Sequence, residues 1–184
     1  INEDLILATV ELPCFVKANR AGSSLGIYKV TTKKELKPSL EKAFEEDSQV
    51  IIESALKGRE VSVGVAYFQG GVHVLPITEI VTDNDFFDYA AKYEGKSKEI
   101  TPAQIPNKWK ELVEHWAKSI YVTLDLKGVV RSEFIFVNGI PHLLEVNTVP
   151  GITRKSIIPK QVEAMGIKLS QFFSYLLLET LAKN

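Results

Sequence analysis

Two short runs in the C-terminal half of the chain carry side chains suited to metal and phosphate chemistry. Arg131-Ser132-Glu133 and Glu145-Val146-Asn147 each place two polar side chains two residues apart, and in a strand such side chains share a face. Between the runs lies Asn138-Gly139, the dipeptide favoured in two-residue hairpin turns. The sequence therefore predicts an antiparallel hairpin with Glu133 beside Glu145.

Two neighbouring carboxylates on one sheet face repel each other unless a positive charge lies between them. Magnesium suits such a site, because it takes a few oxygen ligands from protein and the rest from phosphate and water. The alternative is a solvated face with scattered charges. Apolar residues of the two strands argue against that alternative, because they indicate that the opposite face is covered. These residues are Phe134, Phe136, Leu143, Leu144 and Val146. We therefore expect a metal site at Glu133, Glu145 and Asn147, next to the bend at Pro150-Gly151.

A run of small residues, Gly22-Ser23-Ser24-Leu25-Gly26, follows Lys17 closely. Small residues allow backbone N–H groups to approach phosphate oxygens, and a lysine can reach them as a point charge. The lysine precedes the glycines, so this is not a Walker A loop. Taken alone, the run is more typical of a hairpin turn, but Lys17 on the adjoining strand favours phosphate binding.

Two further segments suit a nucleotide. A predicted strand ends at Glu53, and a short connection containing Leu56 leads to Glu60 at the start of the next strand. Such a connection could offer backbone groups to adenine and a carboxylate to ribose, although an ordinary surface connection explains it equally well.

Residues 82–104 form a long polar segment with four aromatic residues and Lys92, as expected of a lid that excludes water from a reactive intermediate. A solvated loop is the alternative.

Hydrophobic periodicity predicts the elements around these residues. Antiparallel strands alternate with amphipathic helices, which indicates an α+β fold in two subdomains that meet near residues 54–57. Strands are expected at 15–17, 27–30, 50–53, 60–67, 72–77, 128–137 and 140–146, and helices at 32–46, at 105–124 and in two segments after 157.

The composition is that of an ordinary globular protein. The chain has 184 residues, 45% of them hydrophobic and 24% charged, and a net charge of −1, so no global field attracts nucleic acid or an anionic membrane. Cys14 is the single cysteine, which excludes an internal disulfide and favours a reducing cytosol. His73, His115 and His142 have no metal-ligand spacing. Ile1 stands where a methionine is expected, so we expect a fragment of a longer protein.

Together these motifs resemble the D-alanine–D-alanine ligases of the ATP-grasp superfamily. Their order and spacing agree over about residues 12–182, which is far more specific than any single motif. The motifs are Phe15-Val16-Lys17 with Gly22–Gly26, Glu53-x-x-Leu56-x-Gly58, Phe87-Asp88-Tyr89-x-x-Lys92-Tyr93, Arg131-x-Glu133-Phe134, and Glu145-Val146-Asn147-Thr148-x-Pro150-Gly151-Ile152-Thr153-x-x-Ser156.

The resemblance implies an ATP-grasp fold, in which two α+β subdomains with antiparallel sheets enclose the nucleotide. Residues 1–53 would belong to the central subdomain and residues 54–184 to the C-terminal subdomain, with the lid at about 82–104. The family's N-terminal substrate domain would be absent, so the fragment alone would be inactive. The implied reaction joins two D-alanines through a D-alanyl phosphate at the expense of ATP, for peptidoglycan precursors. The family is bacterial and cytoplasmic, and usually homodimeric at full length.

The resemblance also implies a role for each site residue. Lys17 and Lys92 would contact ATP phosphates, Glu53, Leu56 and Glu60 would hold adenine and ribose, and Glu133, Glu145 and Asn147 would bind two Mg²⁺ or Mn²⁺ ions. Ser23 and Tyr93 would orient the substrate and the lid, Arg131 and the Gly151 N–H would stabilise the oxyanion, and Ser156 would bind the carboxylate of the second D-alanine.

Two residues depart from the family pattern. Glu133 stands where an aspartate is usual, and Ala18 replaces a frequent proline.

Two other functions remain open. Another ATP-grasp carboxylate–amine ligase would share the metal carboxylates, but the run from Pro150 to Ser156 argues against it. A non-catalytic nucleotide-binding module would not need the intact Arg131, Glu145, Asn147 and Lys92.

Overall fold

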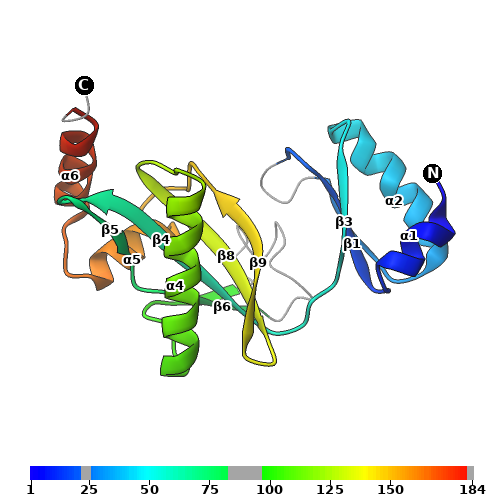
Figure 1. Cartoon of the computed structure of the whole chain (residues 1–184), viewed down its shortest axis with the longest axis horizontal. Coiled ribbons are helices and arrows are strands. Elements are labelled where there is room, and N and C mark those ends of the chain that lie inside the picture. The colour runs from blue at the N-terminus through cyan, green and yellow to red at the C-terminus, as the bar shows by residue number, and fades with distance from the viewer. Residues whose placement is uncertain (22–25, 83–96, 182–184) are drawn as a thin grey trace. The chain divides into compact units, whose positions relative to one another are not determined.

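The computed structural model describes residues 1–21, 26–82 and 97–181 (Figure 1). Contacts between residues divide these into two compact units, one of residues 1–56 and the other of residues 57–82 and 97–181. No helix in these described ranges is both long and apolar enough to cross a membrane.

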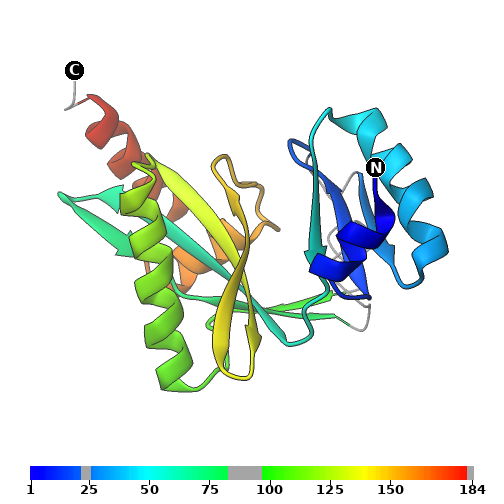
Figure 2. The same cartoon turned by 45° about the vertical axis from the view of Figure 1, so that its right-hand side comes forward.

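The first unit is a small sheet with helices on one face. Its elements are α1 (Glu3–Thr9), β1 (Cys14–Ala18), β2 (Ile27–Val30), α2 (Lys33–Glu46) and β3 (Val50–Ser54), and the antiparallel strands are ordered β2-β1-β3. Cys14 and Val16 are buried against α2. Because side chains alternate along a strand, Phe15 and Lys17 lie on the other face, which the helices leave uncovered (Figure 2).

The second unit is built on a larger antiparallel sheet. Six strands are ordered β7-β6-β4-β8-β9, with β5 also paired to β4. The strands are β4 (Arg59–Phe68), β5 (Gly71–Val74), β6 (Thr78–Thr82), β7 (Ser97–Ile100), β8 (Val129–Val137) and β9 (Ile140–Asn147), and the helices are α4 (Asn107–Thr123), α5 (Ile157–Ala164) and α6 (Leu169–Leu181).

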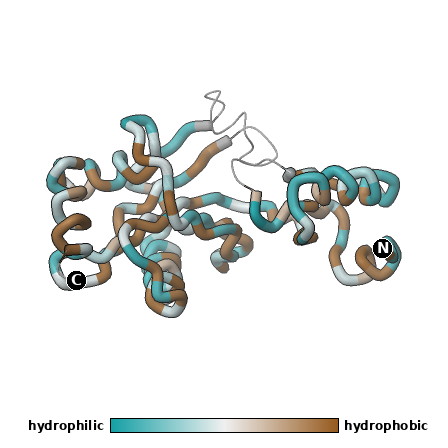
Figure 3. The backbone as a smooth tube through the Cα atoms, turned by 90° about the horizontal axis from the view of Figure 1, so that it is seen from above, coloured by the Kyte–Doolittle hydropathy of each residue, from teal (hydrophilic) through white to brown (hydrophobic). Residues whose placement is uncertain are grey.

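Helices pack on both faces of this sheet. On one face, Val61, Val63 and Val65 of β4 pack with residues of α4. On the other face, Ala66 and Phe68 pack with residues of α5 and α6. Figure 1 shows α4 on one side of the strands and α5 on the other. Figure 3 shows hydrophilic and hydrophobic residues interspersed along the chain, as expected of elements that have one covered and one exposed side.

The face that carries α5 and α6 is only partly apolar. Alternation places Glu60, Ser62 and Gly64 on the same face of β4 as Ala66. Arg131 and Glu133 lie beside them on β8, because Ser62 pairs with Glu133 and Gly64 with Arg131. One half of this face is therefore a helix-covered core and the other half is polar.

The structure corrects three expectations from the sequence. The strand expected over 72–77 ends at Val74, and β6 and β7 were missed. The strand β7, Ser-Lys-Glu-Ile, lies at the sheet edge, where polar residues are tolerated and the periodic signal is weak. Leu143 was expected to be covered, but its side chain is about half exposed at 47% because β9 forms the other edge.

Candidate functional site

The hairpin of β8 and β9 brings the predicted metal ligands together. At its turn, Asn138 and Gly139 both have positive φ, 52° and 80°, as a type I′ turn requires. Val137 pairs with Ile140 beside the turn, and further along Glu133 pairs directly with Glu145, and Arg131 with Asn147. The four polar side chains thus share one face of the sheet.

A β-bulge makes this pairing possible. The register shifts between Glu133 and Phe134. Continued without the shift, the register of the turn would place Glu133 opposite Leu144 and would direct Glu145 to the face covered by α4, because a one-residue slip reverses every side chain. The bulge therefore keeps both carboxylates on the polar half of the other face.

The two carboxylates have different surroundings. Glu133 is 3% exposed, with Arg131 Nε 2.5 Å from its Oε1 and Ser62 Oγ donating to the same oxygen at 3.2 Å. Glu145 is exposed, and its Oε1 accepts a hydrogen bond from Asn147 Nδ2 at 3.1 Å. Glu133 is therefore buried and held by two contacts, whereas Glu145 is exposed to solvent.

This donor set fits a hard divalent cation. No group of three or more His, Cys, Asp or Glu side chains suited to a metal occurs in the part of the chain that the structure describes. The hairpin instead offers two carboxylates and one amide oxygen, which suits Mg²⁺ because that ion keeps several ligands from phosphate and water. A cation would also offset the repulsion between two directly opposed carboxylates.

The segment after β9 folds back on itself. Ser156 Oγ lies 2.9 Å from Thr153 Oγ1, and Ser156 N donates to Thr153 O at 2.8 Å. A Cβ built on Gly151 would lie 3.1 Å from Ser156 Oγ, so Gly151 and Ser156 are close neighbours. The family resemblance assigned the Gly151 N–H to the oxyanion and Ser156 to substrate binding, and the turn places these two residues together directly before α5.

In the first unit, Lys17 and Glu53 form an ion pair on the uncovered sheet face. Phe15 is the direct partner of Glu53 and Lys17 that of Ile51, so the pair is diagonal across β1 and β3. Beyond β3, Ala55 N donates to Pro13 O at 2.9 Å, which ties down the backbone just before the half-buried Leu56. Glu60 is half-buried in β4, in the second unit.

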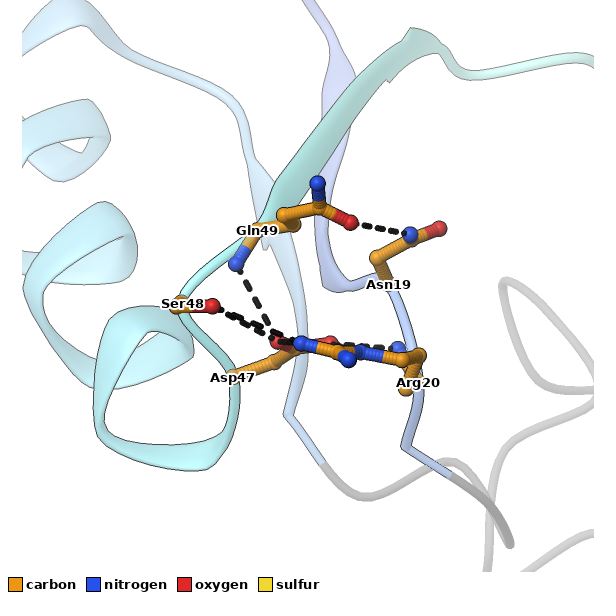
Figure 4. A network of polar contacts seen from close by, with 5 residues as sticks. All are labelled: Asn19, Arg20, Asp47, Ser48 and Gln49. Atoms are coloured by element: carbon orange, nitrogen blue, oxygen red, sulfur yellow. Dashed lines mark hydrogen bonds and ion pairs between the residues drawn. The ribbon is translucent and has the colours of Figure 1, made fainter.

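A network that the sequence did not reveal holds the segment preceding the glycine-rich run (Figure 4). Asp47 Oδ2 accepts from Arg20 N at 2.8 Å and Arg20 Nε at 3.0 Å, and Oδ1 accepts from Arg20 Nη2 at 2.6 Å. Asn19 Nδ2 also donates to Gln49 Oε1 at 3.0 Å. These contacts span nearly thirty residues in sequence, about 27 for Arg20 and Asp47, so no local pattern could have indicated them.

The Arg20 guanidinium holds the pKa of the Asp47 carboxyl well below its usual range, chiefly through their hydrogen bonds.

On the far side of the glycine-rich run, Ala18 N donates to Gly26 O at 3.0 Å, and Gly26 has a φ of +66°, which favours glycine. Arg20 is therefore tied to Asp47 at the end of α2, and Gly26 is tied to Ala18 of β1. Ser23, Lys92 and Tyr93, which the sequence also assigned to the site, lie outside the described residues.

The α+β units with antiparallel sheets and the hairpin carboxylates define an ATP-grasp protein, and comparison with solved structures agrees. The chain superposes on D-alanine–D-alanine ligase from Bacillus anthracis with a TM-score of 0.81 and 34% identity, covering 99% of this chain and 58% of that one. A D-alanyl-alanine synthetase A from Vibrio cholerae gives a TM-score of 0.82 at 32% identity, covering 98% and 55%.

The family follows from the sequence relatives. A family model described as the D-ala D-ala ligase C-terminus matches residues 2–178, and the chain therefore belongs to the D-alanine–D-alanine ligase family. It is 55% identical over 95% of its length to a D-alanine–D-alanine ligase of Flavobacterium johnsoniae and 54% identical over 94% to one of Christiangramia forsetii. The chain spans about half the length of these relatives, 54% and 53%.

Proposed function

We propose that the protein containing this chain is an ATP-dependent ligase that joins two D-alanines through a D-alanyl phosphate. The observation that carries the proposal is the direct pairing of Glu133 with Glu145 and of Arg131 with Asn147 in a chain of this family. Relatives more than half identical to it are named D-alanine–D-alanine ligases, and a solved relative from Bacillus anthracis is complexed with ATP.

In this proposal the first unit supplies much of the nucleotide site. Lys17 lies on the uncovered face of its sheet and would contact ATP phosphates together with Lys92. Glu53 and Leu56 would hold the adenine and Glu60 the ribose. The Lys17–Glu53 ion pair holds the ammonium group of Lys17 beside β3, so that it is placed before the nucleotide arrives.

The hairpin would carry the chemistry. Glu133, Glu145 and Asn147 would hold two Mg²⁺ or Mn²⁺ ions, which when bound would offset the negative charge of the phosphates. One D-alanine carboxylate takes the γ-phosphoryl group of ATP and ADP leaves. The amine of the second D-alanine then attacks the acyl phosphate, loses a proton and expels phosphate.

Other residues would bind the substrates and the tetrahedral intermediate. Arg131 and the Gly151 N–H would stabilise the oxyanion, as fixed donors aimed at developing charge do. Ser156, next to Gly151, would bind the carboxylate of the second D-alanine. Ser23 and Tyr93 would orient the substrate and the lid.

A D-alanyl-D-alanine product would serve peptidoglycan precursor synthesis in the cytoplasm of a bacterium, and the whole protein would form a homodimer. Because the chain spans only about half the length of these relatives, we expect its 184 residues to be inactive by themselves.

Phosphate release from ATP by the whole protein tests the proposal. We expect release only when D-alanine and Mg²⁺ are both present, with a dipeptide product seen by mass spectrometry. D-serine is the matched alternative acceptor, because one solved relative, 34% identical, is named a VanG D-Ala:D-Ser ligase. Turnover with other amino acids but not with D-alanine would overturn the substrate assignment. ATP binding without any turnover would support the non-catalytic alternative.

A further inference from the structure

A buried amide side chain lies where the apolar and polar halves of the sheet face meet. Gln161 of α5 is fully buried, at 0% exposure, and its neighbours in the helix, Ile158 and Val162, belong to an apolar cluster. Its Nε2 donates to Ser62 O at 2.9 Å and to Thr78 Oγ1 at 3.2 Å. Burying an amide costs free energy unless its hydrogen bonds are made. A fully buried glutamine at this position therefore indicates a specific structural role.

Ser62 connects Gln161 to the hairpin carboxylate. Its backbone oxygen accepts from Gln161, and its Oγ donates to Glu133 Oε1 at 3.2 Å. Ser62 is fully buried and is the direct partner of Glu133 across β4 and β8, so its hydroxyl is shielded from water. A continuous chain of hydrogen bonds thus leads from α5 through β4 to Glu133.

Gly64 provides the space that Gln161 occupies. A Cβ at this position would lie 2.4 Å from Gln161 Oε1, 2.8 Å from Leu75 Cδ1 and 2.9 Å from Ile158 Cδ1. A side chain there would force the ends of these three side chains to shift. The close approach of the helix therefore depends on glycine and confines the amide to a narrow space above the strand.

Glu133 needs such support more than a shorter acid would. A glutamate side chain has one more rotatable bond than an aspartate, and this freedom must be restrained for a ligand to be preorganised. Arg131 and Ser62 both contact Oε1. Ser62 can direct its hydroxyl there only while the β4 backbone beside it stays in place.

We propose that Gln161 is a positioning residue for Glu133, acting through Ser62. It would keep α5 and the metal-binding hairpin in a fixed position relative to each other. The inference rests on the proposed function only in taking Glu133 as a metal ligand. Since α5 begins directly after Ser156, the same contact also ties the acceptor-binding turn to the carboxylate. A shift of α5 would disturb both sites together.

Mn²⁺ binding to the whole protein, measured by electron paramagnetic resonance with a non-hydrolysable ATP analogue, tests this role without turnover. Partners of a metal ligand typically contribute ~10–100-fold in affinity. We expect Ser62→Ala to weaken Mn²⁺ binding ~10-fold and Gln161→Met, which keeps the length but removes the donor, to weaken it ~3-fold. The double variant should lose less than the product of the two, because both act along one path.

Val162→Ala is the matched control. Val162 is buried in the same helix but belongs to the apolar cluster, so its truncation should lower the melting temperature and leave Mn²⁺ affinity unchanged. If Gln161→Met does not fold, Gln161→Asn, whose amide is one methylene too short to reach Ser62, serves the same purpose.

The outcomes separate this inference from the proposed function. Unchanged Mn²⁺ affinity in the folded Gln161 variant would overturn the positioning role, and so would an equal loss in Val162→Ala, which would reduce Gln161 to a packing residue. Unchanged affinity in Glu145→Gln would instead overturn the metal site itself. A loss in the Gln161 and Ser62 variants alone, with Val162→Ala unaffected, supports the inference.

Discussion

Glu133 and Glu145 face each other as direct partners across β8 and β9, one of them buried and the other exposed to solvent. Like charges in this position destabilise a hairpin, and the bulge between Glu133 and Phe134 is what brings them together. A feature that costs stability and needs an irregular register is typical of a functional site.

Removing the charge of Glu145 tests that site most directly. We expect Glu145→Gln in the whole protein to lower ATP turnover at least ~100-fold, because a carboxylate that holds a metal contributes its charge as well as its shape. Phosphate release measures the loss, and an unchanged circular dichroism spectrum would show that the fold persists. Glu163→Gln, an exposed carboxylate on α5, is the control. An active Glu145→Gln enzyme would remove the metal assignment.

Lys17 is expected to matter for nucleotide binding through its position as well as its charge. We predict that Lys17→Met weakens ATP binding to the whole protein ~10-fold or more, as expected for loss of a charge-assisted contact with phosphate. Isothermal titration calorimetry measures the change. Lys29→Met is the matched control, because Lys29 pairs with Phe15 and so lies on the same face of the sheet. Equal losses in the two variants would indicate a general charge effect.

The Asp47–Arg20 contact makes a pH-dependent contribution to the first unit. The pKa of Asp47 is lowered in the folded state by Arg20, so its stabilisation is fully present above the ordinary carboxyl pKa of about 3.9 and is lost as the pH falls below it. Asp47→Asn should therefore be less stable than the wild type at pH 7, and the difference should shrink below about pH 4.

Urea unfolding followed by circular dichroism at several pH values measures this difference. Asp4→Asn is the control, because Asp4 pairs with Lys33 but its side chain is 82% exposed, and exposed pairs contribute little. A gap between wild type and Asp47→Asn that stays constant down to pH 3 would contradict the assignment.

A side chain at Gly64 should lower the stability of the second unit. The contacts of a Cβ at 2.4–2.9 Å with Gln161, Leu75 and Ile158 predict that Gly64→Ala lowers the free energy of unfolding by ~1–3 kcal/mol, the usual cost of overpacking. At Gly71, a Cβ would meet only His73 Nε2 at 3.5 Å, so Gly71→Ala should stay within ~1 kcal/mol of the wild type. Urea unfolding of both variants measures the two changes in the free energy of unfolding. Similar losses in Gly64→Ala and Gly71→Ala would show that α5 shifts at little cost.

The sequence by itself determined the local structure and the family. The alternating valines of β4, the Asn-Gly turn and the capping box at Thr32 and Glu35 are local signals, because each depends on residues a few positions apart. The order of the motifs pointed to the D-alanine–D-alanine ligase family, which the family match confirms. The strand β7 escaped notice because a polar edge strand lacks the alternation that marks a covered face. The strand β6, which lies between β7 and β4, was missed as well.

Only the tertiary structure decided how the site is assembled. The sequence predicted Glu133 beside Glu145, but a regular register from the turn would pair Glu133 with Leu144. The shifted register that opposes the two carboxylates depends on which face α4 and α5 cover. The contacts of Arg20 with Asp47 and of Gln161 with Ser62 join residues distant in sequence. Such contacts arise from the packing of whole elements, and no spacing along the chain encodes them.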